Sequence, residues 1–93
     1  MQFSDLEFED HEYKGLGFEI RAKAQFPNGY GASVISGTCA HSDSDHPYEL
    51  AVMKDGQICY DTHITDDVIG YQTSEQITAL LAVIESLPCD GTP

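Results

Sequence analysis

The stretch from Phe18 to Phe26 (FEIRAKAQF) alternates strictly between apolar and polar residues, and this alternation constrains the fold most. A period of two residues predicts a β-strand with one buried face. The apolar positions are Phe18, Ile20, Ala22, Ala24 and Phe26. Pro27-Asn28-Gly29 follows, and an Asn-Gly pair is typical of a tight hairpin because both residues tolerate positive φ. We therefore expect residues 30–35 to return as an antiparallel partner strand.

The remainder of the chain predicts further strands and one helix. Residues 48–53 and 57–61 are expected to be strands joined by a turn, whereas residues 61–71 fit either a short strand or an irregular crossing segment. Thr73 and Gln76 have the spacing of a capping box that starts a helix. Apolar residues then recur at helical spacing at Ile77, Leu80, Leu81, Ile84 and Leu87, before Pro88.

Together these patterns predict an α+β fold, an antiparallel meander of four or five strands packed against one C-terminal amphipathic helix. We expect residues 1–88 to form a single domain and residues 89–93 to be a flexible tail. Three widely spaced cysteines, with neither a signal-peptide pattern nor a long apolar run, favour reduced thiols and a cytoplasmic location.

Charge restricts the possible partners. The chain has 93 residues, of which sixteen are acidic and four basic, for a formal net charge of −12. Hydrophobic residues make up 41% of the chain, enough for a core, so the charge belongs to a folded body. Phosphates would be repelled, which argues against direct binding of nucleic acid or anionic membranes. Three roles remain for the negative charge: it could bind a basic partner, bind a cation, or simply keep the protein soluble.

The segment from Asp5 to Tyr13 (DLEFEDHEY) concentrates five carboxylates without a Lys or Arg. Leu6 and Phe8 alternate with acidic residues, as in an edge strand, and the alternation breaks at Asp10, where we expect a turn or bulge. Charge on an edge strand protects it against edge-to-edge aggregation. The charge of this segment therefore either protects the sheet edge against aggregation or forms a contact for a partner.

Residues 39–46 (CAHSDSDH) gather the side chains that bind metals. Zinc accepts Cys, His and carboxylate ligands, but the spacing matches neither a structural zinc site nor an EF-hand. No nucleophile elbow, P-loop or dinucleotide-binding motif is present. The adjacent Asp66 and Asp67 would point to opposite sides of an extended chain. We expect no metal, no cofactor and no enzymatic activity.

The pattern YELAV…G.ICYDT.ITDDVIGY from Tyr48, followed by the capped helix and Leu87-Pro88, resembles small uncharacterised proteins of phages, prophages and bacteria. The resemblance spans roughly residues 18–88, includes FPNGYGASVISG, and implies no particular activity. Small acidic phage proteins such as anti-CRISPR and antirestriction proteins are similar to this chain in size and charge only.

The leading hypothesis is an inhibitory binding protein that occupies a basic nucleic-acid-binding surface of a host defence complex. The expected contact residues are Glu7, Glu9, Asp10, Glu12, Asp43, Asp45, Asp66 and Asp67. Carboxylates two residues apart on a strand are about 6.8 Å apart, against about 3.4 Å per phosphate of one DNA strand, so a second acidic row is needed. The alternative is a metal- or ligand-binding domain that uses the loop from Cys39 to His46.

Overall fold

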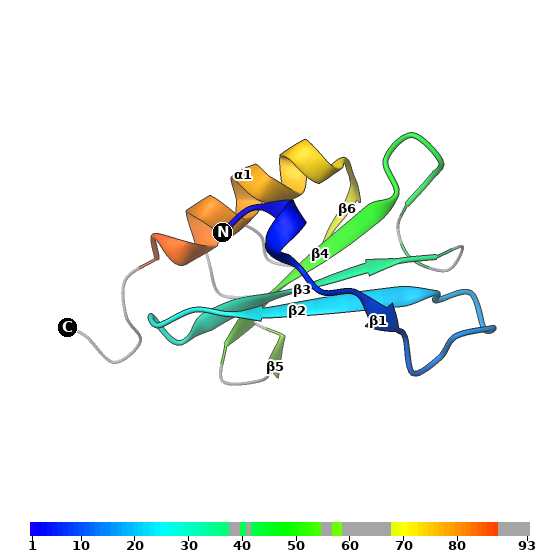
Figure 1. The fold of residues 1–93 in the computed structure, drawn as a ribbon, viewed down its shortest axis with the longest axis horizontal. Helices are drawn as coiled ribbons and strands as arrows, with labels where there is room; N and C mark the ends of the chain where they lie inside the picture. Colours follow the sequence, from blue (N-terminus) through cyan, green and yellow to red (C-terminus); the bar gives the residue numbers. More distant parts are fainter. Residues whose placement is uncertain (38–39, 41, 55–56, 59–67, 88–93) are drawn as a thin grey trace.

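A computed structural model describes residues 1–37, 40, 42–54, 57–58 (by their backbone) and 68–87 (Figure 1). Strands and a single long helix make up most of this part of the chain. In chain order the elements are η1 (Phe3–Asp5), β1 (Glu9–Asp10), β2 (Ile20–Gln25), β3 (Tyr30–Ser36), β4 (Tyr48–Lys54), β5 (Gln57–Ile58), β6 (Ile69–Gln72) and α1 (Ser74–Glu85).

The strands form one antiparallel sheet in the order β1-β2-β3-β4-β5, with β6 also paired to β4. Because β3 occupies one edge of β4, β5 and β6 share its other edge, with β6 beside Tyr48 and Leu50 and β5 beside Met53 and Lys54. The predicted α+β meander with a C-terminal helix is confirmed. The end of the undecided segment 61–71 belongs to a strand, while its residues 61–67 lie outside the described part.

The β2–β3 hairpin forms where it was expected, but its turn is of another type. The backbone N–H of Phe26 donates to the Tyr30 carbonyl at 2.8 Å, and that of Gly29 donates to the Phe26 carbonyl at 3.2 Å. Gly29 has a φ of 88°, whereas Asn28 is not among the residues with positive φ. The loop is therefore a type I turn closed by a left-handed glycine, and only Gly29 uses the freedom expected of both residues.

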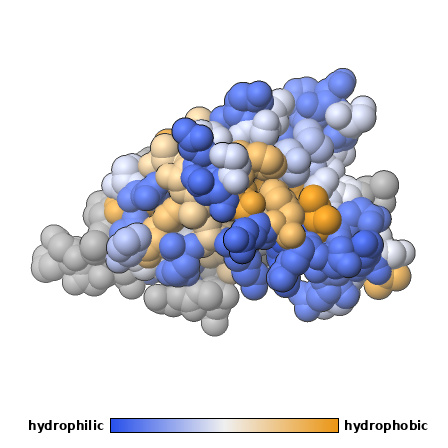
Figure 2. Space-filling view, in the orientation of Figure 1, coloured by the Kyte–Doolittle hydropathy of each residue, from blue (hydrophilic) through white to orange (hydrophobic). Residues whose placement is uncertain are grey.

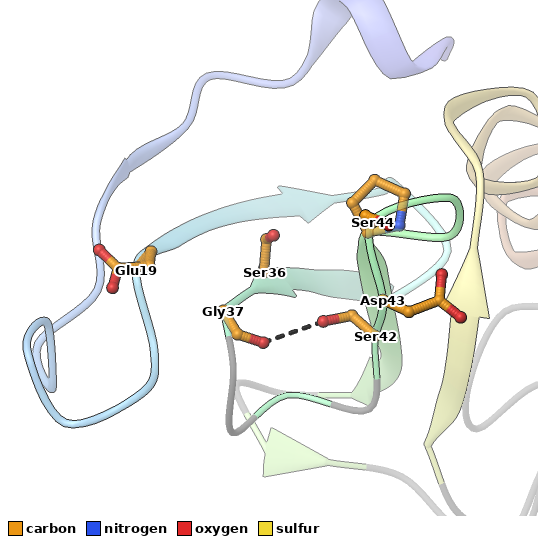
Figure 3. Close-up of a pocket in the computed structure, with 7 residues that line it drawn as sticks. Glu19, Ser36, Gly37, Ser42, Asp43 and Ser44 are labelled. Carbon is orange, nitrogen blue, oxygen red and sulfur yellow. Dashed lines mark hydrogen bonds between the residues drawn. The ribbon is translucent and has the colours of Figure 1, made fainter.

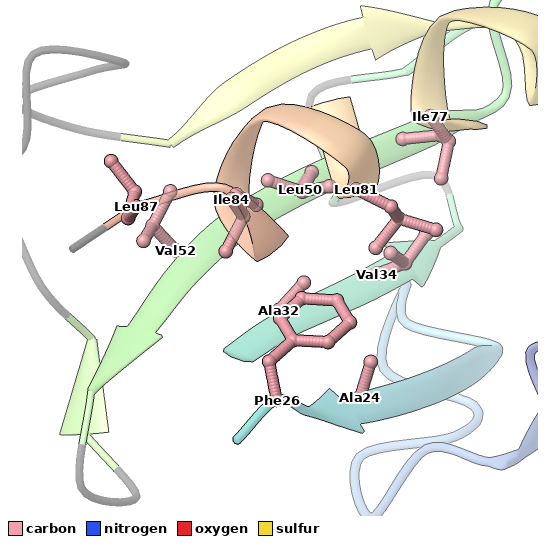
Figure 4. Close-up of a cluster of buried hydrophobic side chains, with 10 residues drawn as sticks. All are labelled: Ala24, Phe26, Ala32, Val34, Leu50, Val52, Ile77, Leu81, Ile84 and Leu87. Atoms are coloured by element: carbon pink, nitrogen blue, oxygen red, sulfur yellow. The ribbon is translucent and has the colours of Figure 1, made fainter. Parts of the chain in front are cut away.

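The core lies between α1 and one face of the sheet (Figure 4). Ile77, Leu81 and Ile84 point from the helix towards the strands and are fully buried. Leu80, expected on the same face, is only partly buried against this core. The predicted capping box is present: the Gln76 N–H donates to Thr73 Oγ1 at 3.2 Å, and the Thr73 N–H donates to Gln76 Oε1 at 2.8 Å.

The N-terminal segment lies against α1 before it joins the sheet. The Phe3 N–H donates to Thr78 Oγ1 at 2.9 Å, and the Phe3 ring lies 4.8 Å from that of Tyr48 and 5.5 Å from that of Phe8. This packing directs Leu6 and Phe8 towards the core without strand pairing. The expected edge strand is therefore only two residues long, Glu9–Asp10. We expected a turn or bulge at this position, and the structure has the turn after it, over residues 12–17.

Candidate functional site at the acidic end of the sheet

The antiparallel order brings two loops to the same end of the sheet. β1 and β3 end there, and β2 and β4 begin there, so the β1–β2 and β3–β4 connections are neighbours (Figure 1). The Glu19 N–H donates to the carbonyl of Ser36, the last residue of β3, at 2.9 Å, which joins the β1–β2 connection to the end of β3. We call this region the acidic end, defined by its carboxylates Glu9, Asp10, Glu12, Glu19, Asp43 and Asp45.

Two basic residues, Lys14 in the β1–β2 loop and Arg21 in β2, are already paired within the protein. Lys14 Nζ lies 3.0 Å from Asp10 Oδ1, and Arg21 Nη1 lies 3.1 Å from Glu12 Oε1. The hydrogen bond to Asp10 and the charge of this carboxylate raise the pKa of Lys14 above its usual 10.5. These pairs offset the charges of Asp10 and Glu12. By contrast, Glu9 is exposed and forms no ion pair within the described part of the chain.

Asp43 organises the loop before β4. Its Oδ1 accepts hydrogen bonds from the backbone N–H groups of Asp45 at 3.0 Å and His46 at 2.6 Å, and lies 3.2 Å from His46 Nδ1. The bond from the His46 N–H is the main reason that the pKa of Asp43 lies below its usual 3.8. Asp43 is thus used to fold its own loop, whereas the exposed carboxylate of Asp45 is left facing solvent.

A shallow pocket of about 260 Å³ lies between the two connections (Figure 3). Its lining residues are Glu19, Ser36, Gly37, Ser42, Asp43, Ser44 and Pro47. Ser42 Oγ donates to the Gly37 carbonyl at 2.9 Å across the pocket. The carboxylates of Glu19 and Asp43 point away from each other on opposite sides (Figure 3), so these two groups do not converge on one point as a general acid and a general base would.

Five of the eight predicted contact residues lie at one end of the sheet. Asp43 and Asp45 lie at the same end of the sheet as Glu9, Asp10 and Glu12, with β2 and β3 between β1 and β4. Glu7 is exposed just before β1. Asp66 and Asp67 lie outside the described residues. Glu19, which sequence reasoning placed on the polar face of a strand, joins the site through its contact with Ser36, which the sequence pattern does not reveal.

The metal-binding alternative concerns the loop from Cys39 to His46. Within residues 1–37, 40, 42–54 and 68–87, no group of three or more Cys, His, Asp or Glu side chains is arranged to hold an ion. Cys39 and His41 lie outside the described residues, as do Cys59 and Cys89. The expectation that this loop binds no metal stays a prediction.

No protein-family model, curated protein or solved structure gives a significant match to the chain. The resemblance to phage-type proteins therefore remains a prediction based on the sequence pattern. Among the described residues, no helix has the length and apolar character needed to span a membrane.

Proposed function

We propose that this is a non-catalytic binding protein of the cytoplasm, which uses its acidic end to occupy a basic protein surface of the kind that holds nucleic acid. The observation that carries the proposal is that two acidic segments, Glu9–Glu12 and Asp43–Asp45, lie at the same end of one sheet. A single strand samples phosphate spacing too sparsely. A second acidic segment at the same end, separated from the first by β2 and β3, adds negative charge to the surface that a partner would meet.

The local chemistry supports a surface complementary to cations. Lys14 and Arg21 are held by Asp10 and Glu12, so these cations do not face a partner alone. Glu9 and Asp45, one from each segment, are exposed and remain available to attract Lys or Arg. A distributed charge of one sign mainly accelerates encounter and orients the partner. An inhibitor of a host defence complex, to which the analogy in size and charge with anti-CRISPR and antirestriction proteins points, is one protein that would work in this way.

The test is capture from a bacterial lysate at low salt, followed by competition with DNA. The immobilised protein is compared with two variants of equal charge: Glu9→Gln with Asp45→Asn at the acidic end, and Glu75→Gln with Glu85→Gln on α1. We expect the wild type and the α1 variant to retain the same nucleic-acid-binding protein, which duplex DNA releases, and the acidic-end variant to lose it. Equal capture by the two variants would contradict the proposal.

The second candidate function is ligand binding in the loop before β4, favoured by the pocket beside Asp43. Elemental analysis of the purified protein distinguishes this candidate from the proposed binding of a basic protein surface. About one metal ion per chain, lost when His41 and His46 are both replaced by Ala, would support this candidate instead.

A further inference from the structure

We infer that the loop of residues 11–17, here called the tip loop, is the anchoring element of the acidic end, with Tyr13 and Leu16 entering an apolar recess bordered by Lys and Arg on a protein partner. The inference rests on the proposed function and adds to it the part of the contact that does not depend on charge. Charge brings a partner close, whereas a few buried aromatic and aliphatic side chains hold most complexes together.

The first observation is the exposure of two large apolar side chains in one short loop. Leu16 is 71% exposed, the highest value among the large apolar residues described, and Tyr13 is 54% exposed. Single exposed apolar residues are common and need no explanation. Here, however, two lie three positions apart, and the Leu16 N–H donates to the Tyr13 carbonyl at 3.0 Å, which fixes them in one turn.

The second observation is that the tip loop is held in one conformation by its own contacts. His11 Nδ1 accepts a hydrogen bond from the Tyr13 N–H at 3.0 Å, and the His11 ring stacks on Phe18 at 5.0 Å. The Lys14 N–H donates to the His11 carbonyl at 2.9 Å. The His11 N–H in turn donates to the Glu19 carbonyl at 2.9 Å, which closes the base of the loop.

A third contact fixes the far side of the loop. Gly37, at the end of β3, packs so closely on the backbone of Gly17 and Phe18 that an added Cβ would collide with both. A loop that is ordered before binding loses little conformational entropy when it binds, so its apolar side chains contribute more of their burial to affinity. The exposed pair is therefore presented on a rigid support.

The surrounding charges indicate what kind of partner fits. Glu12, which is paired with Arg21, lies within the tip loop, Glu19 follows it, and Glu9 lies in the strand that leads into it. Lys14 within the loop is paired with Asp10, so it does not oppose a basic rim. Figure 2 shows hydrophilic atoms over most of the end of the molecule at which the loop lies. An apolar pair within acidic surroundings matches an apolar recess with a basic border, and it disfavours anionic membranes.

The experiment uses the full chain and two synthetic peptides of equal length, one of lysine only and one that alternates lysine and leucine. Affinities are measured by calorimetry at about 50 mM salt, where exposed charges are weakly screened. We expect Tyr13→Ser and Leu16→Ser each to weaken binding of the lysine–leucine peptide roughly tenfold, as loss of a buried apolar side chain implies, and to leave binding of the lysine peptide unchanged.

Two exposed apolar residues outside the acidic end provide matched controls, since Tyr71 is 52% and Val83 42% exposed. Tyr71→Ser and Val83→Ser should change neither affinity. If the tip-loop variants bind the lysine–leucine peptide as the wild type does, while the lysine peptide still binds, the inference is wrong and the proposed function stands. If neither peptide binds the wild type, both the inference and the proposed function are wrong. Binding to neutral lipid vesicles that is lost in Leu16→Ser would instead assign the loop to a membrane and overturn the inference.

Discussion

The side-chain amide of Asn28 donates a hydrogen bond of 3.0 Å to the backbone carbonyl of Ile84, a residue 56 positions further along the chain. The same Nδ2 group lies within hydrogen-bond distance of the carbonyls of Glu85, at 3.2 Å, and Leu87, at 2.9 Å. The last carbonyls of a helix have no partner within the helix. The β2–β3 turn therefore caps the C-terminus of α1 and fixes the helix to the far end of the sheet from the acidic loops.

Replacing Asn28 should loosen this attachment. We expect Asn28→Ala to lower the free energy of unfolding by about 1–3 kcal/mol, because buried carbonyls lose their donor. Asn28→Asp should destabilise further, since it sets a carboxylate against those carbonyls. Urea denaturation measures both, with the exposed Gln25→Ala as a control expected to stay within about 0.5 kcal/mol of wild type. Equal stability of Asn28→Ala and the control would show that the cap contributes nothing.

The helix phase gives a second prediction. Leu81 is fully buried, whereas Val83 is 42% exposed on the opposite face of α1. Leu81→Ala should cost about 2–5 kcal/mol of stability through lost burial and the cavity it leaves. Val83→Ala should change the stability little. Thermal melting of the two variants measures both effects. Similar losses in the two variants would mean that the helix is rotated relative to the sheet.

Gly37 is predicted to control the position of the tip loop. It has a φ of 148°, and an added Cβ would lie 2.8 Å from Phe18 Cα. Gly37→Ala should cost more than the roughly 1–2 kcal/mol of backbone strain alone and should shift the amide NMR signals of residues 11–19. Gly15→Ala is the comparison, because Gly15 also has a positive φ, of 90°, but open space beside it. Unchanged tip-loop signals in Gly37→Ala would contradict this contact.

The loop before β4 should respond to acid through Asp43. The N–H of His46 stabilises the Asp43 carboxylate, so the pKa of this group in the folded protein lies below its usual value of 3.8. A lowered pKa contributes stability that is present above pH 3.8 and is lost as the pH falls through the folded value. Carbon NMR titration should find a midpoint below 3.8, and Asp43→Asn should remove the transition from the amide signals of Asp45 and His46. A midpoint at or above 3.8 would rule out this anchoring role.

Short-range patterns were sufficient to predict much of the fold. The alternation from Phe18 to Phe26 indicates a strand because side chains alternate across a sheet. Thr73 and Gln76 mark the helix start because the capping box is made within four residues. Both features depend on neighbours in sequence. The helix start appears as predicted, whereas the strand is shorter than the alternating stretch and covers Ile20–Gln25.

Features that depend on tertiary packing could not be predicted in this way. Phe3 and Phe8 pack with Tyr48, a contact that prevents the first half of DLEFEDHEY from pairing as a strand. The role of Asn28 as a helix cap and the contact of Glu19 with Ser36 likewise join segments distant in sequence. The acidic residues were identifiable from composition, whereas their gathering at one end depends on the strand order.

The central claim is that the acidic end, and not the total charge of the protein, recruits a basic partner. The direct measurement is the association rate with the protein captured from the lysate, for the two variants of equal net charge. One is Glu9→Gln with Asp45→Asn, and the other is Glu75→Gln with Glu85→Gln. Rates are recorded from about 50 to 500 mM salt, over which the Debye length falls from roughly 14 to 4 Å.

We expect the acidic-end variant to associate about tenfold more slowly than the wild type at low salt, and the difference to vanish at high salt, since distributed charge acts mainly on encounter. The α1 variant should associate at close to the wild-type rate throughout. Thermal melts should show all three proteins equally stable, because exposed charges contribute little to folding. If the two variants associate equally slowly, or if neither differs from wild type at low salt, the acidic end is not the binding site.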